Sequence, residues 1–385
     1  MYHEELESIS RRGLARIVRD RDCADTPPEA GTARIVLDGK EFLHFSSNDY
    51  LGLARHTDLA AASARALGEC GTGAGAARLL GGGTRYHRDL EKQTAKFKGT
   101  DDALLFNSGY TANLGAIPSL AGEGDVIFSD ALNHASIVDG CRLSKAKTVI
   151  YRHCDAGHLQ DLLRTEKGKR RLVITDSVFS MDGDIAPIML LYEICRQNDA
   201  LLYIDDAHGT GVLGSGYGAL RHFGIAPDDR IIQMGTFSKA LGSFGAFVAA
   251  QTDIVRYLLN TARGFIFSTA LPAGVAAASL EALRLVGTDD SYNRRLWKNR
   301  KMLADGLATL GYDISRSGTP ILPLFVGDIE TTLACGDFLR NHGIFAPAIR
   351  PPTVSTPRIR LTVTAGHTEA DIRQLLDVLS SWRSR

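Results

Sequence analysis

The feature that most restricts the fold of this chain is a series of short apolar runs without strict alternation of apolar and polar residues. Stretches with helical patterning, such as 131–141, 159–165 and 187–198, separate most of these runs. Runs of this kind are typical of strands buried on both faces, as in a mostly parallel sheet covered by helices. The pattern therefore predicts an α/β fold. The runs are Ala103–Phe106, Val126–Phe128, Thr148–Tyr151, Leu172–Thr175, Leu201–Ile204, Ile231–Met234 and Ala246–Ala250.

The two ends of the chain differ from its middle in the pattern of apolar and charged residues. Residues 4–20 have apolar side chains near helical spacing, and two short apolar runs flank a turn at Asp38 and Gly39, which predicts a hairpin. Beyond about residue 292, charged helical stretches alternate with single strands. We therefore predict three parts: an N-terminal helix and hairpin segment (1–50), a large α/β domain (51–285) and a smaller C-terminal α+β domain (286–385).

Charge and composition exclude several classes of protein. The 385 residues contain 44 Lys and Arg against 44 Asp and Glu, so nucleic acid and anionic membranes are not expected partners. No apolar run approaches the roughly 18 residues of a membrane span, and the N-terminus lacks a signal-peptide pattern. The cysteines show no metal-type spacing, so we expect no metal and reduced thiols in a cytoplasmic protein. These cysteines are Cys23, Cys70, Cys141, Cys154, Cys195 and Cys335.

A glycine-rich segment at Gly71–Gly83 loosely matches the dinucleotide-binding fingerprint. That fingerprint requires a strand directly before it, whereas an Ala-rich helical stretch, 59–70, precedes this one. A nucleotide-binding oxidoreductase is therefore disfavoured, and a loop that wraps over a neighbouring site is the better interpretation.

An anion-binding turn is predicted after the run that ends at Phe106. The sequence continues through Ser108 and Gly109 into a helical stretch, and the first N–H groups of a helix are free to bind an anion. A phosphate at Gly109 and Tyr110 is physically reasonable. Turns of this kind occur in every α/β fold, so this segment alone is a weak signal.

Ionisable groups follow two later strands. The run 201–204 ends in Asp205, Asp206 and His208, at the sheet edge where open α/β folds bind ligands. These acids could simply cap a loop and pair with a surface base, or one could be buried against a cationic heteroaromatic nitrogen. Lys239 is the only lysine between positions 169 and 298, and it lies in a nearly uncharged stretch. A desolvated lysine of this kind forms Schiff bases, although a lysine extending from a buried element to solvent would give the same pattern.

The joint order of these parts is stronger evidence than any one of them. Four parts follow one another along the chain: a helix start that could bind an anion, Ser180, Asp-x-x-His from Asp205 and Thr-x-x-Lys from Thr236. Pyridoxal 5'-phosphate (PLP) needs a lysine for its aldehyde, an acid for its ring nitrogen and donors for its phosphate. The order of the motifs therefore predicts a PLP site.

The sequence resembles the α-oxoamine synthase family of fold-type I PLP enzymes, from about Arg11 to the C-terminus. Two segments resemble the branch that acts in biotin biosynthesis more than its glycine-using relatives: Ala262–Pro272 and Ala348–Val354. The segments that carry the family resemblance are SSNDYLG at Ser46–Gly52, GTGAG at Gly71–Gly75, DDAHGTG at Asp205–Gly211 and TFSKALG at Thr236–Gly242.

The resemblance implies roles for individual residues. Lys239 would bind the cofactor covalently and act as acid and base, Asp205 would pair with the ring nitrogen, and His208 would hydrogen-bond the ring hydroxyl. His134 would stack on the ring. The further cofactor contacts would be Gly109, Tyr110, Ser180 and Thr236, and the substrate contacts would be Arg16, Asn48, Arg350 and Thr353, with Arg19 as an alternative to Arg16.

The resemblance also implies a reaction, substrates and an assembly. The expected reaction is the decarboxylative condensation of L-alanine with pimeloyl-CoA or pimeloyl-acyl carrier protein, in a homodimer with active sites between subunits. The alternative is a glycine-using relative such as 2-amino-3-ketobutyrate CoA ligase. Asp176, where the family commonly has Glu, and Ser355, where a proline is usual, depart from the family pattern, and the second leaves the acyl-chain preference open.

Overall fold

The computed structural model describes residues 2–12, 14–22 and 33–384, and it divides into two compact units. The small unit comprises Met1–Gly52, Met181–Gly183 and Arg295–Arg385, and the large unit comprises Leu53–Ser180 and Asp184–Arg294. The N-terminal residues, which we predicted as a part of their own, thus belong to the same unit as the C-terminal residues.

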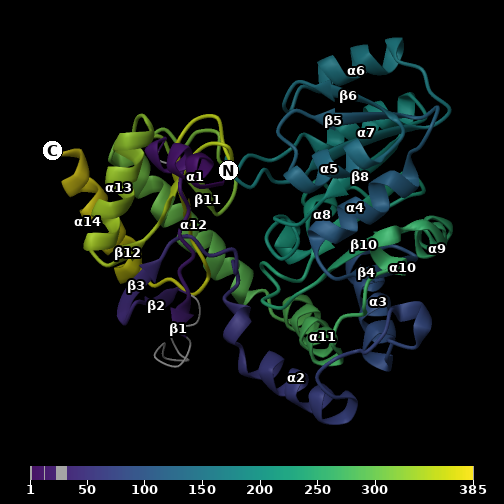
Figure 1. The fold of residues 1–385 in the computed structure, drawn as a ribbon, viewed down its shortest axis with the longest axis horizontal. Helices are drawn as coiled ribbons and strands as arrows, with labels where there is room; N and C mark the ends of the chain where they lie inside the picture. The colour runs from purple at the N-terminus through teal and green to yellow at the C-terminus, as the bar shows by residue number, and fades with distance from the viewer. Residues whose placement is uncertain (1, 13, 23–32, 385) are drawn as a thin grey trace. The chain divides into compact units, whose positions relative to one another are not determined.

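The large unit is built on a seven-stranded sheet with the order β4-β10-β9-β8-β7-β5-β6 (Figure 1). β10 is antiparallel to both of its neighbours, and the remaining pairs are parallel. The prediction of a mostly parallel α/β sheet is therefore confirmed. The strands are β4 Asp102–Phe106, β5 Val126–Asp130, β6 Lys147–Tyr151, β7 Arg171–Asp176, β8 Leu201–Asp205, β9 Ile231–Thr236 and β10 Ala246–Ala250.

Helices flank this sheet, and one pair among them packs through small side chains. Ala62 and Ala66 of α2 lie in one buried cluster with Ala273 and Ala277 of α11. A Cβ on Gly274 would come within 2.9 Å of Leu67 and Ser63, so the two helices approach too closely for a larger residue there. The helices are α2 Thr57–Cys70, α3 Arg85–Lys98, α4 Gly109–Leu120, α5 Ala135–Leu143, α6 Ala156–Thr165, α7 Ile188–Gln197, α8 Ala219–His222, α9 Thr252–Thr261, α10 Arg263–Ile266 and α11 Ala273–Thr288.

The small unit contains two sheets, with the orders β1-β2-β3-β12 and β11-β14-β13. β12 pairs in parallel with β3, which joins the N-terminal hairpin to C-terminal residues and explains why both ends of the chain share a core. The strands are β1 Arg21–Asp22, β2 Arg34–Leu37, β3 Lys40–His44, β11 Ile321–Leu324, β12 Ile344–Phe345, β13 Ala348–Ile349 and β14 Arg358–Thr362. The helices are α1 Tyr2–Arg11, α12 Ser291–Thr309, which belongs to the small unit from Arg295 onward, α13 Ile329–Asn341 and α14 Glu369–Arg383.

The predicted helix over residues 4–20 is wrong in its second half, because α1 ends at Arg11. None of the residues of α1 is buried, and Ile17 and Val18 are 78% and 87% exposed. A short helix gains most of its stability from tertiary packing of its apolar face, and this segment has no such packing. Within the described residues no helix is long and apolar enough to cross a membrane. The five described cysteines are free, and Cys23 lies outside the described residues.

A buried ion pair fixes the turn that follows β8. Lys98 donates to a carboxylate oxygen of Asp206 at 2.8 Å, and both side chains are 1% exposed. Lys98 also donates to the Tyr217 carbonyl at 2.9 Å, while Asp206 accepts from the Ser177 hydroxyl at 2.7 Å. A Cβ on Gly218 would come within 2.0 Å of Asp206, so the backbone closes tightly over the pair. Asp206 is therefore a structural anchor for the turn that carries Asp205 and His208.

Removing the cation from this pair should destabilise the large unit. We expect Lys98→Met to lower the free energy of unfolding of the apoprotein by about 3–5 kcal/mol, because an uncompensated carboxylate is left buried. Denaturant titration followed by circular dichroism measures the change. The double variant with Asp206→Asn should recover part of the loss, and equal stability of Lys98→Met and the parent protein would contradict the role of the pair.

Candidate active site

A cavity of about 190 Å³ opens in the large unit at the carboxyl ends of its central strands. The eight residues predicted to contact a cofactor all line it, although they come from five separate segments of the chain. Residues at the carboxyl ends of neighbouring parallel strands meet at one edge of a sheet, which explains how residues far apart in the chain line one cavity. The eight are Gly109, Tyr110, His134, Ser180, Asp205, His208, Thr236 and Lys239.

Asp205 is the buried acid of this cavity, with 3% of its surface exposed. Asn113 donates its amide to one carboxylate oxygen at 2.8 Å, and the Ala207 N–H donates to the other at 3.0 Å. Burial raises the pKa of Asp205, while the charge of Lys239 and these hydrogen bonds act in the opposite direction. A cation placed beside this carboxylate would relieve its desolvation, as a protonated heteroaromatic nitrogen would do.

His134 lies at the N-cap of α5, where its ring nitrogen Nδ1 is 2.7 Å from the Ser136 hydroxyl. Burial lowers the pKa of His134, and the charge of Lys239 lowers it further against the opposing effect of Asp205. The ring is therefore neutral at physiological pH. A neutral, solvent-accessible imidazole in the lining of this cavity suits stacking on a flat ring.

Two functional residues were missed by the reasoning from sequence. Asn113 donates to Asp205 and to the Ser136 hydroxyl, and its own carbonyl oxygen accepts from the Tyr203 hydroxyl at 2.8 Å. This network links the buried acid to the residue that holds His134. The available signal was an amide between small and apolar residues in a mostly apolar helix, since a buried amide must find hydrogen-bond partners.

Asp176 is the second missed residue, noted in the sequence only as a departure from the family pattern. Its carboxylate lines the cavity and accepts the backbone N–H of His134 at 2.7 Å. Burial raises its pKa well above the usual range, and repulsion from Asp205 raises it further. Asp176 therefore adds a second buried carboxyl group to the cavity, close enough to Asp205 for the two to repel each other when both are charged.

One part of the cavity lining suits a phosphate group. The Thr236 hydroxyl is buried without a hydrogen-bond partner among the described residues. A Cβ on Gly109 would lie 2.8 Å from Thr236, so only glycine leaves room between the two. Gly109 and Tyr110 also begin α4, whose first N–H groups point out of the helix. The buried Thr236 hydroxyl and the free N–H groups at the start of α4 are donors that fit the phosphate of PLP.

Lys239 follows β9 in a turn closed by the Gly242 N–H, which donates to the Lys239 carbonyl. Gly242 has φ +62°, and a Cβ there would lie 2.3 Å from the Ala54 backbone nitrogen, so this position requires glycine. The side chain of Lys239 is half-buried and lines the cavity. The turn thus places an amine beside the groups that suit a ring and a phosphate.

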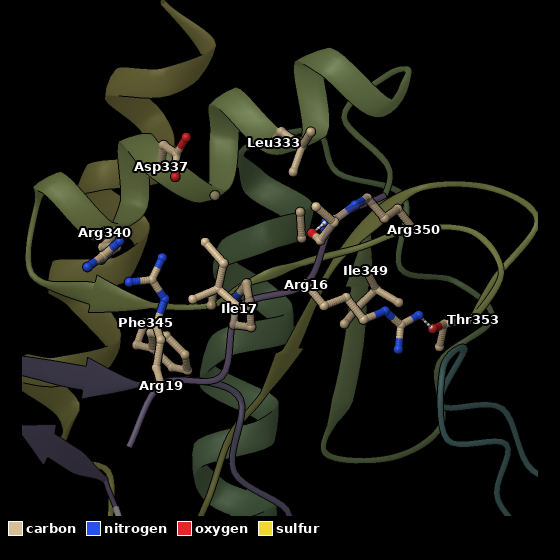
Figure 2. A pocket seen from close by; sticks show the side chains of 15 residues that line it. Arg16, Ile17, Arg19, Leu333, Asp337, Arg340, Phe345, Ile349, Arg350 and Thr353 are labelled. Carbon is tan, nitrogen blue, oxygen red and sulfur yellow. Dashed lines mark hydrogen bonds between the residues drawn. The ribbon is translucent and has the colours of Figure 1, made fainter. Parts of the chain in front are cut away.

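The small unit has a separate cavity of about 450 Å³ (Figure 2). Arg16 extends toward Thr353, to whose hydroxyl it donates at 3.1 Å, and Arg350 donates to the Ala15 carbonyl at 2.6 Å. Arg19 lines the same cavity but pairs with Asp38 at 3.6 Å. The predicted substrate residues Arg16, Arg350 and Thr353 therefore lie together.

Asn48, the fourth predicted substrate residue, does not line this cavity. Its side-chain oxygen accepts from the Arg360 guanidinium at 3.1 Å, and the Tyr50 hydroxyl lies 3.4 Å away. Asn48 is exposed while Arg360 is buried, so the amide oxygen caps a buried cation.

Comparison with known proteins agrees with this site. A model of the aminotransferase class I and II family matches residues 40–379. The chain is 49% identical to 8-amino-7-oxononanoate synthase of Geobacter metallireducens, over 99% of this chain and 97% of that protein, and 46% identical to that of Geobacter sulfurreducens, over 98% and 96%. A solved serine palmitoyltransferase variant from S. paucimobilis, with PLP and myriocin bound, superposes with a TM-score of 0.92 at 29% identity, over 100% of this chain and 96% of that one.

The fold and the cavity define a PLP-dependent enzyme of fold type I. The chain belongs to the aminotransferase class I and II family, within its α-oxoamine synthase branch.

The role of Asn113 can be tested through cofactor affinity. We expect Asn113→Ala to weaken PLP binding about tenfold, because a hydrogen bond to a buried carboxylate is lost and the Ser136 hydroxyl loses its donor. Titration of the apoprotein with PLP, followed by visible absorbance, measures the change. Asn260, whose amide bonds only to the Arg256 carbonyl on an exposed helix face, gives the matched control Asn260→Ala. Equal affinities of the two variants would contradict the proposed network.

Proposed function

We propose that this protein catalyses the PLP-dependent decarboxylative condensation of L-alanine with a pimeloyl thioester. The products are 8-amino-7-oxononanoate, CO2 and the free thiol, and the product serves biotin synthesis. The cavity in the large unit carries the proposal, because it combines an amine, a buried acid and a phosphate cradle. Full-length relatives at 46–49% identity that bear the name of this synthase support the choice of substrates.

The residues of the large unit would bind the cofactor and transfer a proton at the α-carbon of alanine. When bound, PLP supplies an electron sink that stabilises negative charge at the α-carbon of the amino acid. Asp205 would keep the ring nitrogen protonated, His134 would stack on the ring, and His208 and Ser180 would orient it. Gly109, Tyr110 and Thr236 would hold the phosphate. Lys239 would bind the cofactor and would later move a proton at the α-carbon of alanine.

The residues of the small unit would bind the anionic and acyl parts of the substrates. Arg350 is proposed to hold the carboxylate of alanine, since a guanidinium matches a carboxylate in a two-pronged geometry. Arg16 and Thr353 would contact the acyl thioester, and Asn48 would act close to them. A homodimer, a cytoplasmic location, and coenzyme A or an acyl carrier protein as the acyl carrier are further parts of the proposal, supported by what the family resemblance implies.

Lys239 gives the direct test of the chemistry. We expect Lys239→Ala to fold and to bind PLP without the visible absorption of a lysine Schiff base, and to lose turnover, because among the described residues no other amine lines the cavity. Absorbance before and after borohydride treatment, together with circular dichroism for the fold, provides the readout. Retained turnover in this variant would refute the assignment of Lys239.

The substrate pair can be tested by crossing two amino acids with two thioesters. Alanine and glycine are each assayed with pimeloyl-CoA and acetyl-CoA. We expect the alanine and pimeloyl-CoA combination to have the highest kcat/KM. A preference for glycine with acetyl-CoA would instead place the protein with the glycine-using synthases.

Arg16 and Arg19 form a matched pair for testing acyl recognition, since both line the cavity but only Arg16 bonds to Thr353. We expect Arg16→Ala to raise the KM for the pimeloyl thioester about tenfold, through loss of a charged hydrogen bond, and to leave the KM for alanine unchanged. Arg19→Ala should change neither value appreciably. The opposite order of effects in steady-state kinetics would assign acyl recognition to Arg19.

A further inference from the structure

A charged cluster lies beside the cofactor cavity but contributes no residue to its lining. It consists of Asp130 at the end of β5, His153 and Cys154 after β6, and Asp184. His153 Nδ1 lies 2.9 Å from Asp130 Oδ1, and Nε2 lies 2.6 Å from Asp184 Oδ2. A single imidazole ring thus bridges two carboxylates that are 54 residues apart in the chain.

Asp130 organises the turn that leads to His134. One of its carboxylate oxygens accepts the Leu132 N–H at 2.9 Å, and the other accepts the Cys154 N–H at 2.8 Å. Its backbone carbonyl accepts the Asn133 N–H at 3.3 Å. The side chain of Asp130 is 1% exposed. The position at which α5 begins, and with it the place of His134, therefore depends on this carboxylate.

Asp184 organises the segment that carries Ser180. The Phe179 N–H donates to the Asp184 carbonyl at 3.1 Å, and Val178 forms an antiparallel bridge with Ile185. The edge of the His153 ring also packs against Phe179, with centroids 4.4 Å apart and planes at 89°. Both Asp184 and the residue directly before Ser180 therefore contact the same imidazole.

The ring can make both contacts only when both of its nitrogens carry protons. Burial alone would lower the pKa of His153, but the hydrogen bonds to Asp130 and Asp184 raise it to about 12. The ring is therefore an imidazolium at physiological pH, and it donates to both carboxylates.

We propose that His153 is a positioning residue of the cofactor site, which holds the turn bearing His134 and the segment bearing Ser180 in fixed places on two sides of the cavity. This inference rests on the proposed cofactor role of the cavity. His153 acts through Asp130 and Asp184 and touches neither the cofactor nor the substrates.

The first experiment measures PLP affinity of the apoprotein by absorbance and by the shift in melting temperature that PLP produces. We expect His153→Gln to weaken PLP binding about tenfold, since an amide cannot donate to both carboxylates. His222, an exposed histidine on α8, gives the control His222→Gln with unchanged affinity. Should His153→Gln fail to fold, Asp184→Asn removes one of the two contacts and should weaken binding in the same direction.

A double-mutant cycle separates positioning from a general structural role. If His153 acts through Ser180, the loss of affinity in His153→Gln with Ser180→Ala should be smaller than the product of the two single losses. A purely structural histidine would lower the melting temperature of the apoprotein without changing PLP affinity. That result, or two losses that multiply independently, would overturn the inference.

Addition of zinc tests whether these atoms bind a metal ion instead of sharing a proton. Cys154 Sγ lies 3.6 Å from His153 Nε2 and 3.9 Å from Asp184 Oδ2, so a metal ion could replace the proton on Nε2. We expect one equivalent of Zn²⁺ to leave the melting temperature of chelator-treated protein unchanged. Stabilisation that Cys154→Ser abolishes would overturn the proposal. Failure of the parent protein to bind PLP would instead reject the proposed function.

Discussion

The burial of Asp205 at the end of β8 is the constraint on which the rest of the site depends. A carboxylate that is 3% exposed is costly unless hydrogen bonds and positive charge surround it. Asn113, the Ala207 N–H and the charge of Lys239 provide this environment. The first half of α4, the turn after β8 and the turn after β9 therefore each contribute one group to the same carboxylate.

Two adjacent acids show how position decides the role of a residue. Asp206 accepts hydrogen bonds from Lys98, Ser177 and Thr210, so its negative charge is already compensated by a cation and two hydroxyl groups of the protein. Asp205 accepts from the Asn113 amide and the Ala207 N–H, and its carboxylate lines the cavity, where it can bind a cationic ring. The local pattern of an apolar run followed by two acids left open which of them was structural, because neighbours in a chain carry the same local signal, whereas the family resemblance implied that Asp205 meets the ring nitrogen.

Much of the fold could be predicted because parallel strands buried on both faces leave clear apolar runs. The residues that follow those runs, such as Asp205 and Thr236, could also be predicted, since they meet at one edge of the sheet. Asn113, Asp176 and His153 could not, because each acts through partners more than twenty residues away. The second half of the predicted helix over 4–20 failed for a related reason: amphipathic spacing does not show whether an apolar face finds a packing partner.

The two cavities differ in what they can bind. The cavity of the large unit has buried acids, an amine and an unpaired hydroxyl, which suit a flat cationic ring with a phosphate. The cavity of the small unit is lined by arginines together with apolar side chains such as Ile17 and Phe345, which suit a chain with an anionic group. The described contacts to the cofactor site therefore come from the large unit, and the arginines proposed to bind the substrates come from the small unit.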